Sequence, residues 1–444
     1  MNDLLTKALL ALLSNRPKPI FDVLKDHFGR NPRKNAIVQA QYSCSRQTCI
    51  NRALNHIVGT RRRHGSVVGI ASTDYELSFG DLIHPDNFDQ QTVGPLQYKD
   101  VLLSDGTNLS CPEKALYLIN DGTNKFAAYL YHPRYEDHIV LEVMAKDKRA
   151  AQDFLHRVAL EADLQSIYKG QVVTLKEGKR QEVTFQFHNV PKITREQLIL
   201  QPEVIDEIER HTAGFSKHKE LLVSRGRHLK RGLLLYGPPG TGKSLTIMYL
   251  LTAMPGRTAI VLSGNSVKHL EDACALARGL QPATVIIDDV DLVAQDRTAK
   301  NYNPLLFELM NQMDGLADDA DVLFLLTTNK PEILEPALAS RPGRIDLAVL
   351  IPLPDKECRR RLFELYSQGL PLAVSDMNKF IESTDGVSAA YIRELFRKAT
   401  LFAAEEGAEV SICDKHIEAA SKLLSSTDKM TDKLLGGNMK GTED

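Results

Sequence analysis

Cysteine is scarce in this sequence and is not arranged to hold a metal. The chain has 444 residues and six cysteines. Only Cys44 and Cys49 lie near each other, and their separation does not match the paired spacing of a zinc site. The pattern argues against a structural zinc centre and favours unpaired thiols in a reducing compartment.

A hydrophobic run long enough to cross a membrane is also missing. The stretch from Leu4 to Leu13 contains Lys7 and has about half of the ~20 residues that a membrane-spanning helix needs. No convincing small-residue cleavage site follows it. We therefore expect an amphipathic helix there, no membrane span, and a cytoplasmic location.

The sequence lacks a large excess of either charge, since its formal net charge is −2. Whole-chain charge therefore gives no sign of nucleic acid or membrane as the dominant partner. Residues 1–65 differ, because they hold twelve Lys and Arg against Asp3, Asp22 and Asp26. This surplus is typical of a solvated helical face, and an arm that binds an acidic surface is the alternative.

The length predicts two or three folded units, because domains usually run to roughly 100–200 residues. A hydrophobic content of 43% and a charged content of 25% are ordinary for globular protein. The composition and element pattern predict five segments: a basic helical segment at 1–65, an α+β partner-binding domain at 66–190, a large α/β subdomain at 191–355, a helical lid at 356–425 and a mobile tail at 426–444.

A hairpin is the clearest local signal in the α+β domain. Apolar runs at 115–119 and 126–131 flank the turn 120–124, which is rich in residues that tolerate positive φ. From Pro191 onward strands and helices alternate, which predicts a parallel sheet covered by helices. The other predicted elements are strands at 138–144 and near Val172 and Val183, and helices at 148–164, 356–370, 377–383 and 388–406.

A glycine-rich loop carries the strongest functional signal. Residues 237–244 read Gly-Pro-Pro-Gly-Thr-Gly-Lys-Ser and follow the apolar run 233–236. Such a loop aims backbone N–H groups and a helix dipole at a polyphosphate. Lys243 is expected to reach the β and γ phosphates of ATP, and the Ser244 hydroxyl to ligate Mg²⁺. A fortuitous glycine turn is the alternative, and the two correct flanks argue against it.

Two acidic residues follow a predicted buried strand that lies C-terminal to the glycine-rich loop. Asp288 and Asp289 follow the apolar run in residues 282–287. We interpret Asp288 as the metal-side acid and Asp289 as the residue that polarises the attacking water. A carboxylate pair that caps the following helix is the alternative, and we interpret Asp291 as structural.

Polar and basic residues complete the candidate site. Asn329 ends the predicted strand 322–329 and is expected to hold the lytic water or the γ-phosphate. Arg341 and Arg344 lie three residues apart in a loop, and we interpret them as groups that reach the γ-phosphate bound by a neighbouring subunit. Surface ion pairs are the alternative for these two arginines.

These motifs together resemble the AAA family of ATPases over roughly residues 195–425. The P-loop, the Asp288 strand, 313–316, 328–331 and 341–344 follow the family's order and spacing. The resemblance implies an α/β P-loop NTPase fold with a parallel sheet and a small C-terminal helical lid, after a mixed α+β region. It also implies a homo-oligomeric ring, usually a hexamer, that hydrolyses ATP with Mg²⁺ to remodel or move a macromolecule. The nucleotide-contacting residues that it implies are Gly237, Pro238, Pro239, Gly240, Thr241, Gly242, Lys243, Ser244, Leu245, Ala389 and Ala390.

The sequence departs from the family pattern at two places. Asp289 stands where most relatives carry Glu, and its side chain is one methylene shorter, so slow turnover is an open alternative. The segment 263–270 is short and has no aromatic residue, unlike the pore loop of protein-threading members. It is similar to the mitochondrial AAA translocase of a folded iron–sulfur protein and to bacterial proteins resembling it.

Three functions follow from these observations. The favoured one is a ring ATPase that remodels a protein client selected by residues 1–190. The second is a nucleotide-gated assembly scaffold that hydrolyses ATP weakly. The third is a nucleic-acid-dependent motor, which the absence of an aromatic platform beside the N-terminal charges disfavours.

Overall fold

The computed structural model divides the chain into two compact units. The first comprises residues 1–169 and 175–187, and the second comprises 170–174 and 188–444. The finer division into five segments remains a proposal. The residues that the structure describes are 17–59, 64–71, 77–84, 91–133, 136, 138–177, 183–291, 304–315, 317, 320–331, 345–407 and 411–426.

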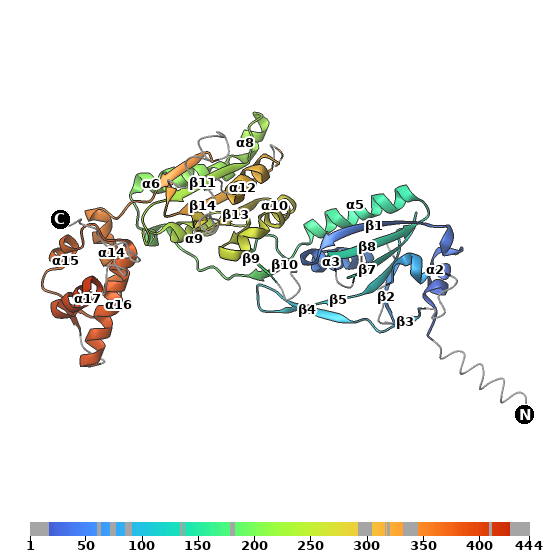
Figure 1. The fold of residues 1–444 in the computed structure, drawn as a ribbon, viewed down its shortest axis with the longest axis horizontal. Helices are drawn as coiled ribbons and strands as arrows, with labels where there is room; N and C mark the ends of the chain where they lie inside the picture. Colours follow the sequence, from blue (N-terminus) through green and yellow to red (C-terminus); the bar gives the residue numbers. More distant parts are fainter. Residues whose placement is uncertain are drawn as a thin grey trace, which may run out of the picture. The chain divides into compact units, whose positions relative to one another are not determined.

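The first unit contains a six-stranded antiparallel sheet with the order β1-β8-β7-β6-β2-β3 (Figure 1). β6 and β7 pair from Ala115 with Leu130 to Asn120 with Lys125, which confirms the predicted hairpin. A separate two-stranded ribbon, β4 with β5, belongs to the same unit. The strands are β1 (Ala36–Ser43), β2 (His64–Ile70), β3 (Val93–Gly94), β4 (Tyr98–Leu102), β5 (Asn108–Pro112), β6 (Ala115–Asn120), β7 (Lys125–Tyr131), β8 (His138–Ala145) and β10 (Val183–Phe187).

Helices pack on this sheet through apolar faces. α5 contacts β1, β8 and α3, and its predicted bounds are confirmed. The Asp147 side chain caps α5 by accepting a hydrogen bond from the backbone N of Ala150 at 2.9 Å. On α2, Ile20 and Leu24 join a buried cluster with Tyr129 of β7. The helices are α2 (Ile20–Phe28), α3 (Gln47–Gly59), α4 (Phe79–Leu82) and α5 (Lys148–Leu164), with short 3-10 turns η1 (Pro32–Lys34) and η2 (Cys44–Arg46).

The expected all-helical character of residues 1–65 is wrong for one stretch. Residues 36–43 form β1, which pairs with β8 from Ala36 opposite Ala145 to Ser43 opposite His138. Alternate residues of β1 are exposed over most of its length, as on a strand with one covered face. The pairing partner lies about a hundred residues further along the chain, so local sequence did not reveal it.

The second unit contains a parallel sheet in the order β9-β12-β13-β14-β11-β15 (Figure 1). Every residue of β14 is buried, as expected for a strand covered on both faces. In a parallel sheet all carboxyl ends meet at one edge and all amino ends at the other. The strands are β9 (Val172–Glu177), β11 (Arg231–Tyr236), β12 (Thr258–Leu262), β13 (Ala283–Ile287), β14 (Val322–Thr328) and β15 (Leu347–Leu350).

The helices that accompany this sheet confirm the predicted alternation. α9 follows the glycine-rich loop directly after β11. α10 contacts β12 and β13, and α9 contacts β14. They are η3 (Arg195–Gln197), α6 (Pro202–Glu209), η4 (Arg210–Gly214), α7 (Phe215–Lys217), α8 (Lys219–Ser224), α9 (Lys243–Ala253), η5 (Gly264–His269), α10 (Leu270–Gly279) and α12 (Pro304–Asp314).

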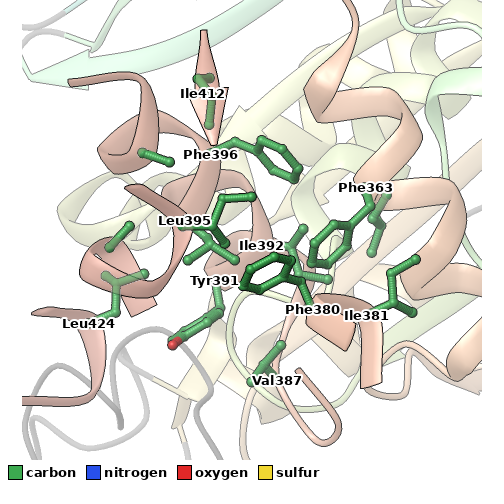
Figure 2. Close-up of a cluster of buried hydrophobic side chains, with 14 of the residues drawn as sticks. Phe363, Phe380, Ile381, Val387, Tyr391, Ile392, Leu395, Phe396, Ile412 and Leu424 are labelled. Carbon is green, nitrogen blue, oxygen red and sulfur yellow. The ribbon is translucent and has the colours of Figure 1, made fainter. Parts of the chain in front are cut away.

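The C-terminal part of the second unit is a helical lid with its own core. Figure 2 shows aromatic and branched side chains of α14, α15 and α16 gathered there. The rings of Phe363 and Phe396 meet edge to face with centroids 5.3 Å apart. The predicted lid helices are confirmed, and a short parallel pair of strands, β16 with β17, accompanies them. The elements are α14 (Lys356–Ser367), β16 (Leu372–Ala373), α15 (Met377–Ser383), α16 (Ala389–Glu406), β17 (Ile412–Cys413) and α17 (Asp414–Ser426).

The structure does not describe residues 1–16 and 427–444. The amphipathic helix predicted from Leu4 to Leu13 therefore lies outside the described residues, as does the predicted mobile tail beyond residue 426. Within the described part of the chain, no helix has the length and apolar character needed to cross a membrane.

Candidate functional site

The glycine-rich loop joins the carboxyl end of β11 to the first turn of α9. Gly237 has φ +145°, and a Cβ atom there would lie 2.2 Å from the Ile351 carbonyl oxygen. Gly240 has φ +74°, and a Cβ there would lie 2.8 Å from Ser388 Oγ. Both positions therefore require glycine for backbone conformation and for space. The resulting turn brings the loop to the N-terminus of α9, where a phosphate is favoured.

Lys243 lies folded over this loop. Its Nζ donates hydrogen bonds to the carbonyl oxygens of Gly237 at 2.9 Å and Pro238 at 2.8 Å. The residue is 6% exposed, and burial lowers the pKa of its ammonium against the opposing effect of nearby carboxylates. Phosphate oxygens form stronger, charge-assisted hydrogen bonds than neutral carbonyls do. The loop therefore holds a buried ammonium where a polyphosphate would be bound.

Ser244 and Asp288 bring two hard oxygen donors together across the sheet edge. Ser244 Oγ lies 3.2 Å from Asp288 Oδ2, although the residues are far apart in sequence. Thr327 of β14 donates to Asp288 Oδ1 through its hydroxyl and accepts the backbone N–H of Asp289 at 2.8 Å. Mg²⁺ is usually held by one or two such groups, with phosphate and water oxygens as its other ligands. The pair fits a Mg²⁺ site that is completed by a nucleotide.

Asp289 lies in an unusual backbone and electrostatic environment. It is a non-glycine residue with φ 52°, in the left-handed region that L residues adopt at an energetic cost. Asn329 Nδ2 donates to its Oδ1 at 3.1 Å. Burial raises the pKa of Asp289, and the neighbouring Asp288 and Asp291 raise it further, against Lys243 and Asn329. A carboxylate whose pKa is raised in this way is a stronger proton acceptor.

Asp291 positions the next strand end. Its Oδ1 accepts hydrogen bonds from Thr328 Oγ1 at 2.9 Å and from the backbone N of Asn329 at 3.1 Å. Asp291 is 2% exposed. The geometry is that of a residue that orients Asn329, consistent with its structural interpretation. Thr327 and Thr328 were not identified from the sequence, although two hydroxyls directly before Asn329 at a strand end were a usable signal.

The lid reaches the glycine-rich loop at one backbone contact. The N–H of Ala390, in the first turn of α16, donates to the Gly240 carbonyl oxygen at 3.0 Å. Ser388 caps the same helix through a hydrogen bond from the backbone N of Tyr391 at 3.2 Å. Ala389 and Ala390 are both half-buried there. The small residues predicted to approach the adenine therefore start a helix that contacts the loop.

The structure thus brings most of the predicted site together at the carboxyl edge of the sheet. The start of α9 contributes Lys243 and Ser244. The segments directly after β13 and β14 contribute Asp288, Asp289 and Asn329. The interpretation of Arg341 and Arg344 concerns a stretch, 332–344, outside the described residues. Most of the short segment 263–270 is a 3-10 turn, η5 (Gly264–His269), and its last residue, Leu270, begins α10.

Comparisons with known proteins extend this picture. Residues 233–353 match the model of the ATPase family associated with various cellular activities, AAA. The chain is 31% identical over 289 residues to the proteasome-activating nucleotidase of Methanothermobacter thermautotrophicus, an alignment that covers 60% of this chain and 68% of the relative. It is 29% identical over 325 residues to the cell division cycle protein 48 homolog of Archaeoglobus fulgidus, covering 66% of this chain and 43% of the relative.

A third relative is similar over a shorter region. The proteasome-activating nucleotidase of Thermococcus onnurineus is 28% identical over 232 residues, which cover 49% of this chain and 58% of the relative. The chain spans about half the length of this protein and of the Archaeoglobus relative, at 58% and 43%.

Proposed function

Because this chain belongs to the AAA family of ATPases, we propose that it hydrolyses ATP and uses the hydrolysis to remodel a protein client. One observation carries the proposal: a phosphate-binding loop and an acid whose pKa is raised lie at the same sheet edge. Lys243 belongs to the phosphate-binding loop, and Asp289 is the acid whose pKa is raised. Both are needed for phosphoryl transfer to water.

Different residues of the site bind the phosphates, the adenine and the Mg²⁺ ion of the ATP substrate. The backbone N–H groups of the glycine-rich loop, which Pro238 and Pro239 lack, and the Lys243 ammonium bind the β and γ phosphates. The lid residues Ala389 and Ala390 approach the adenine. Ser244 and Asp288 would hold Mg²⁺, which would neutralise charge on the phosphates. Thr327 fixes the Asp288 carboxylate by donating its hydroxyl hydrogen.

Asp289 and Asn329 act on the attacking water. Asp289 accepts a hydrogen bond from the water and takes its proton as the bond to phosphorus forms. The Asn329 amide orients Asp289 through the 3.1 Å hydrogen bond. Arg341 and Arg344 supply positive charge to the site of an adjacent subunit in a homo-oligomeric, hexameric ring.

The client of the ring is a protein selected by the first unit. The Methanothermobacter relative is named a proteasome-activating nucleotidase, and this name supports a protein substrate class for the present chain. η5 has no aromatic residue to grip an extended chain, so we propose remodelling rather than threading. The six thiols are consistent with a cytoplasmic setting.

A second function is favoured by a specific observation at Asp289. Its side chain is shorter than Glu, and the 3.1 Å bond to Asn329 engages one of its two carboxylate oxygens. If that bond persists with ATP bound, hydrolysis is slow and ATP acts mainly to hold the ring together. In this scaffold function assembly depends on ATP binding and not on turnover.

Steady-state phosphate release from the full chain tests the proposal. Lys243→Ala is expected to lose nucleotide binding and turnover, and Asp289→Asn to bind ATP but to lose turnover. Lys217→Ala and Asp153→Asn, at exposed positions, are the matched controls. Turnover equal in wild type and Asp289→Asn would remove the assigned role of Asp289.

Size in solution separates the two functions. Under the remodelling proposal the ring forms with ATP, and Arg341→Ala lowers turnover within the assembled ring. Under the scaffold alternative the ring forms with ATP while wild-type turnover is already as slow as that of Asp289→Asn. A chain that stays monomeric with saturating ATP contradicts both.

A further inference from the structure

The six cysteines fall into two groups by burial. All six lie within the described part of the chain, and each carries a thiol rather than a disulfide. Four are buried, and burial raises the pKa of each thiol, to about 12 for Cys274 and Cys358. A buried thiol with a raised pKa is inert toward electrophiles. The remaining two, Cys44 and Cys413, are half-buried, and each lies beside a histidine.

The sheet of the first unit brings Cys44 and His132 together. β1 and β7 both pair antiparallel with β8, so these two strands run in the same direction and end at the same edge. Cys44 directly follows β1, and His132 directly follows β7. Cys44 Sγ lies 3.1 Å from His132 Nε2. The fold thus places a nucleophile beside a base from positions 88 residues apart.

A backbone carbonyl sets the tautomer of His132. Nδ1 lies 2.9 Å from the carbonyl oxygen of Pro133. A carbonyl oxygen only accepts, so Nδ1 carries the hydrogen. In the neutral imidazole the lone pair is then on Nε2, which faces the thiol. This is the arrangement of nucleophile, base and orienting group that activates a cysteine.

The second cysteine–histidine pair has the opposite arrangement. Cys413 Sγ lies 3.5 Å from His416 Nδ1. The same Nδ1 lies 3.1 Å from the backbone N of Cys413. The backbone N–H donates to that nitrogen, so its lone pair is already engaged. His416 is 2% exposed. Cys413 therefore serves as an internal control: it is a half-buried thiol beside a histidine nitrogen that already accepts a hydrogen bond from the backbone.

We propose that Cys44 is a nucleophilic thiol, activated by His132, that undergoes exchange with small-molecule disulfides. The thiol proton passes to His132 Nε2 as the sulfur attacks one sulfur of the disulfide. A new S–S bond forms to Cys44 as the old one breaks, and the departing thiolate takes the proton from the imidazolium. The small disulfide is the oxidant, and one small thiol is released for each chain modified.

The test treats the native full chain with glutathione disulfide at pH 7 and follows the mixed disulfide at each cysteine by peptide mass spectrometry. We expect Cys44 to react about tenfold faster than Cys413 and far faster than the four buried thiols. An ordinary thiol is about 3% thiolate at pH 7, so activation has a ceiling of about 30-fold. Equal rates at Cys44 and Cys413 would overturn the proposal.

Two histidine variants assign the effect to the base. His132→Gln is expected to reduce the Cys44 rate about tenfold, while His416→Gln leaves the Cys44 rate unchanged. His132→Ala with added imidazole is expected to recover part of the rate, which lost packing alone does not do. Thermal melting checks that each variant is folded, and in urea all six cysteines of the wild type are expected to react alike. An unchanged Cys44 rate in folded His132→Gln refutes the role of His132.

Discussion

The two edges of the parallel sheet both hold clusters of buried charge, and the clusters are balanced differently. At the carboxyl edge, Asp288, Asp289 and Asp291 surround one ammonium, that of Lys243. At the amino edge, Asp321 lies directly before β14 and meets the cations Arg231 and Arg257, which lie at the starts of β11 and β12. In the first cluster three carboxylates surround one ammonium, whereas in the second two guanidinium groups contact one carboxylate.

The pKa values of Asp289 and Asp321 are therefore shifted in opposite directions, although burial alone raises both. Burial alone would raise the pKa of Asp321, but Arg257, Arg231 and Lys219 together lower it below its ordinary value. Arg257 Nη1 lies 2.7 Å from Asp321 Oδ1, and both side chains are 4% exposed. Burial likewise raises the pKa of Asp289, and there the neighbouring Asp288 and Asp291 raise it further, so that Lys243 and Asn329 do not reverse the shift. A buried carboxyl with a raised pKa, such as Asp289, is typical of functional sites. A carboxylate held between buried cations, such as Asp321, is typical of structural ion-pair networks.

Asp289→Asn gives the largest expected effect on activity and tests the carboxyl edge. Under the proposed mechanism it removes the proton acceptor, and turnover falls by about 10²–10⁴-fold. The folded state loses an unfavourable charge at the same time, so the free energy of unfolding rises by about 0.5–1 kcal/mol. Phosphate release and urea unfolding measure the two quantities on one sample. A large loss of stability would mean that Asp289 is a structural residue.

Asp321→Asn tests the amino edge with the same chemical change. It leaves the Arg257 and Arg231 guanidinium groups buried without their carboxylate, and stability is expected to fall by about 3–5 kcal/mol. Nucleotide affinity, measured under conditions where the variant is folded, is expected to stay within about twofold of wild type. Asp153→Asn on α5, an exposed position, is the control for the loss of one negative charge.

The pH dependence of stability sharpens the same comparison. The folded-state pKa of Asp321 lies below its ordinary value of 3.8. Its ionised form is therefore favoured by folding, so its contribution is complete above about pH 4 and is lost as pH falls through the folded pKa. The stability difference between wild type and Asp321→Asn should accordingly shrink below about pH 4. A difference that stays constant from pH 7 to pH 3 would show that lost packing, not charge, causes the destabilisation.

Sequence reasoning succeeded where the signal was local. The glycine-rich loop lies between β11 and α9 within a few residues, and α5 begins at a capping residue, Asp147. The acidic and amide residues of the candidate site could be placed because Asp288, Asp289 and Asn329 each follow a recognisable apolar run. Asp288 and Asn329 could then be assigned to the same edge from the parallel-sheet rule alone.

The sequence did not reveal features that depend on long-range pairing. Arg257 and Asp321 lie 64 residues apart, and their contact follows only from the strand order β12-β13-β14. Cys44 and His132 meet because β8 lies between β1 and β7, and the sequence pattern predicts helix, not strand, over the residues of β1. The positive φ of Asp289 likewise occurs at a strand end where its backbone N–H donates to Thr327 Oγ1 of a different strand. None of these has a short-range sequence signal.

Lys219→Ala gives the smallest expected effect and tests whether burial, rather than charge alone, sets the strength of the amino-edge cluster. Lys219 Nζ lies 3.3 Å from Asp321 Oδ2, but its side chain is 44% exposed whereas that of Arg257 is 4% exposed. Water and salt screen the exposed pair, so we expect a stability loss under about 1 kcal/mol, decreasing with added salt. Arg257→Ala, measured beside it by urea unfolding, should cost several times more. Equal stability losses for Lys219→Ala and Arg257→Ala would mean that water reaches the amino-edge cluster despite its buried side chains. The two sheet edges would then differ in charge but not in burial.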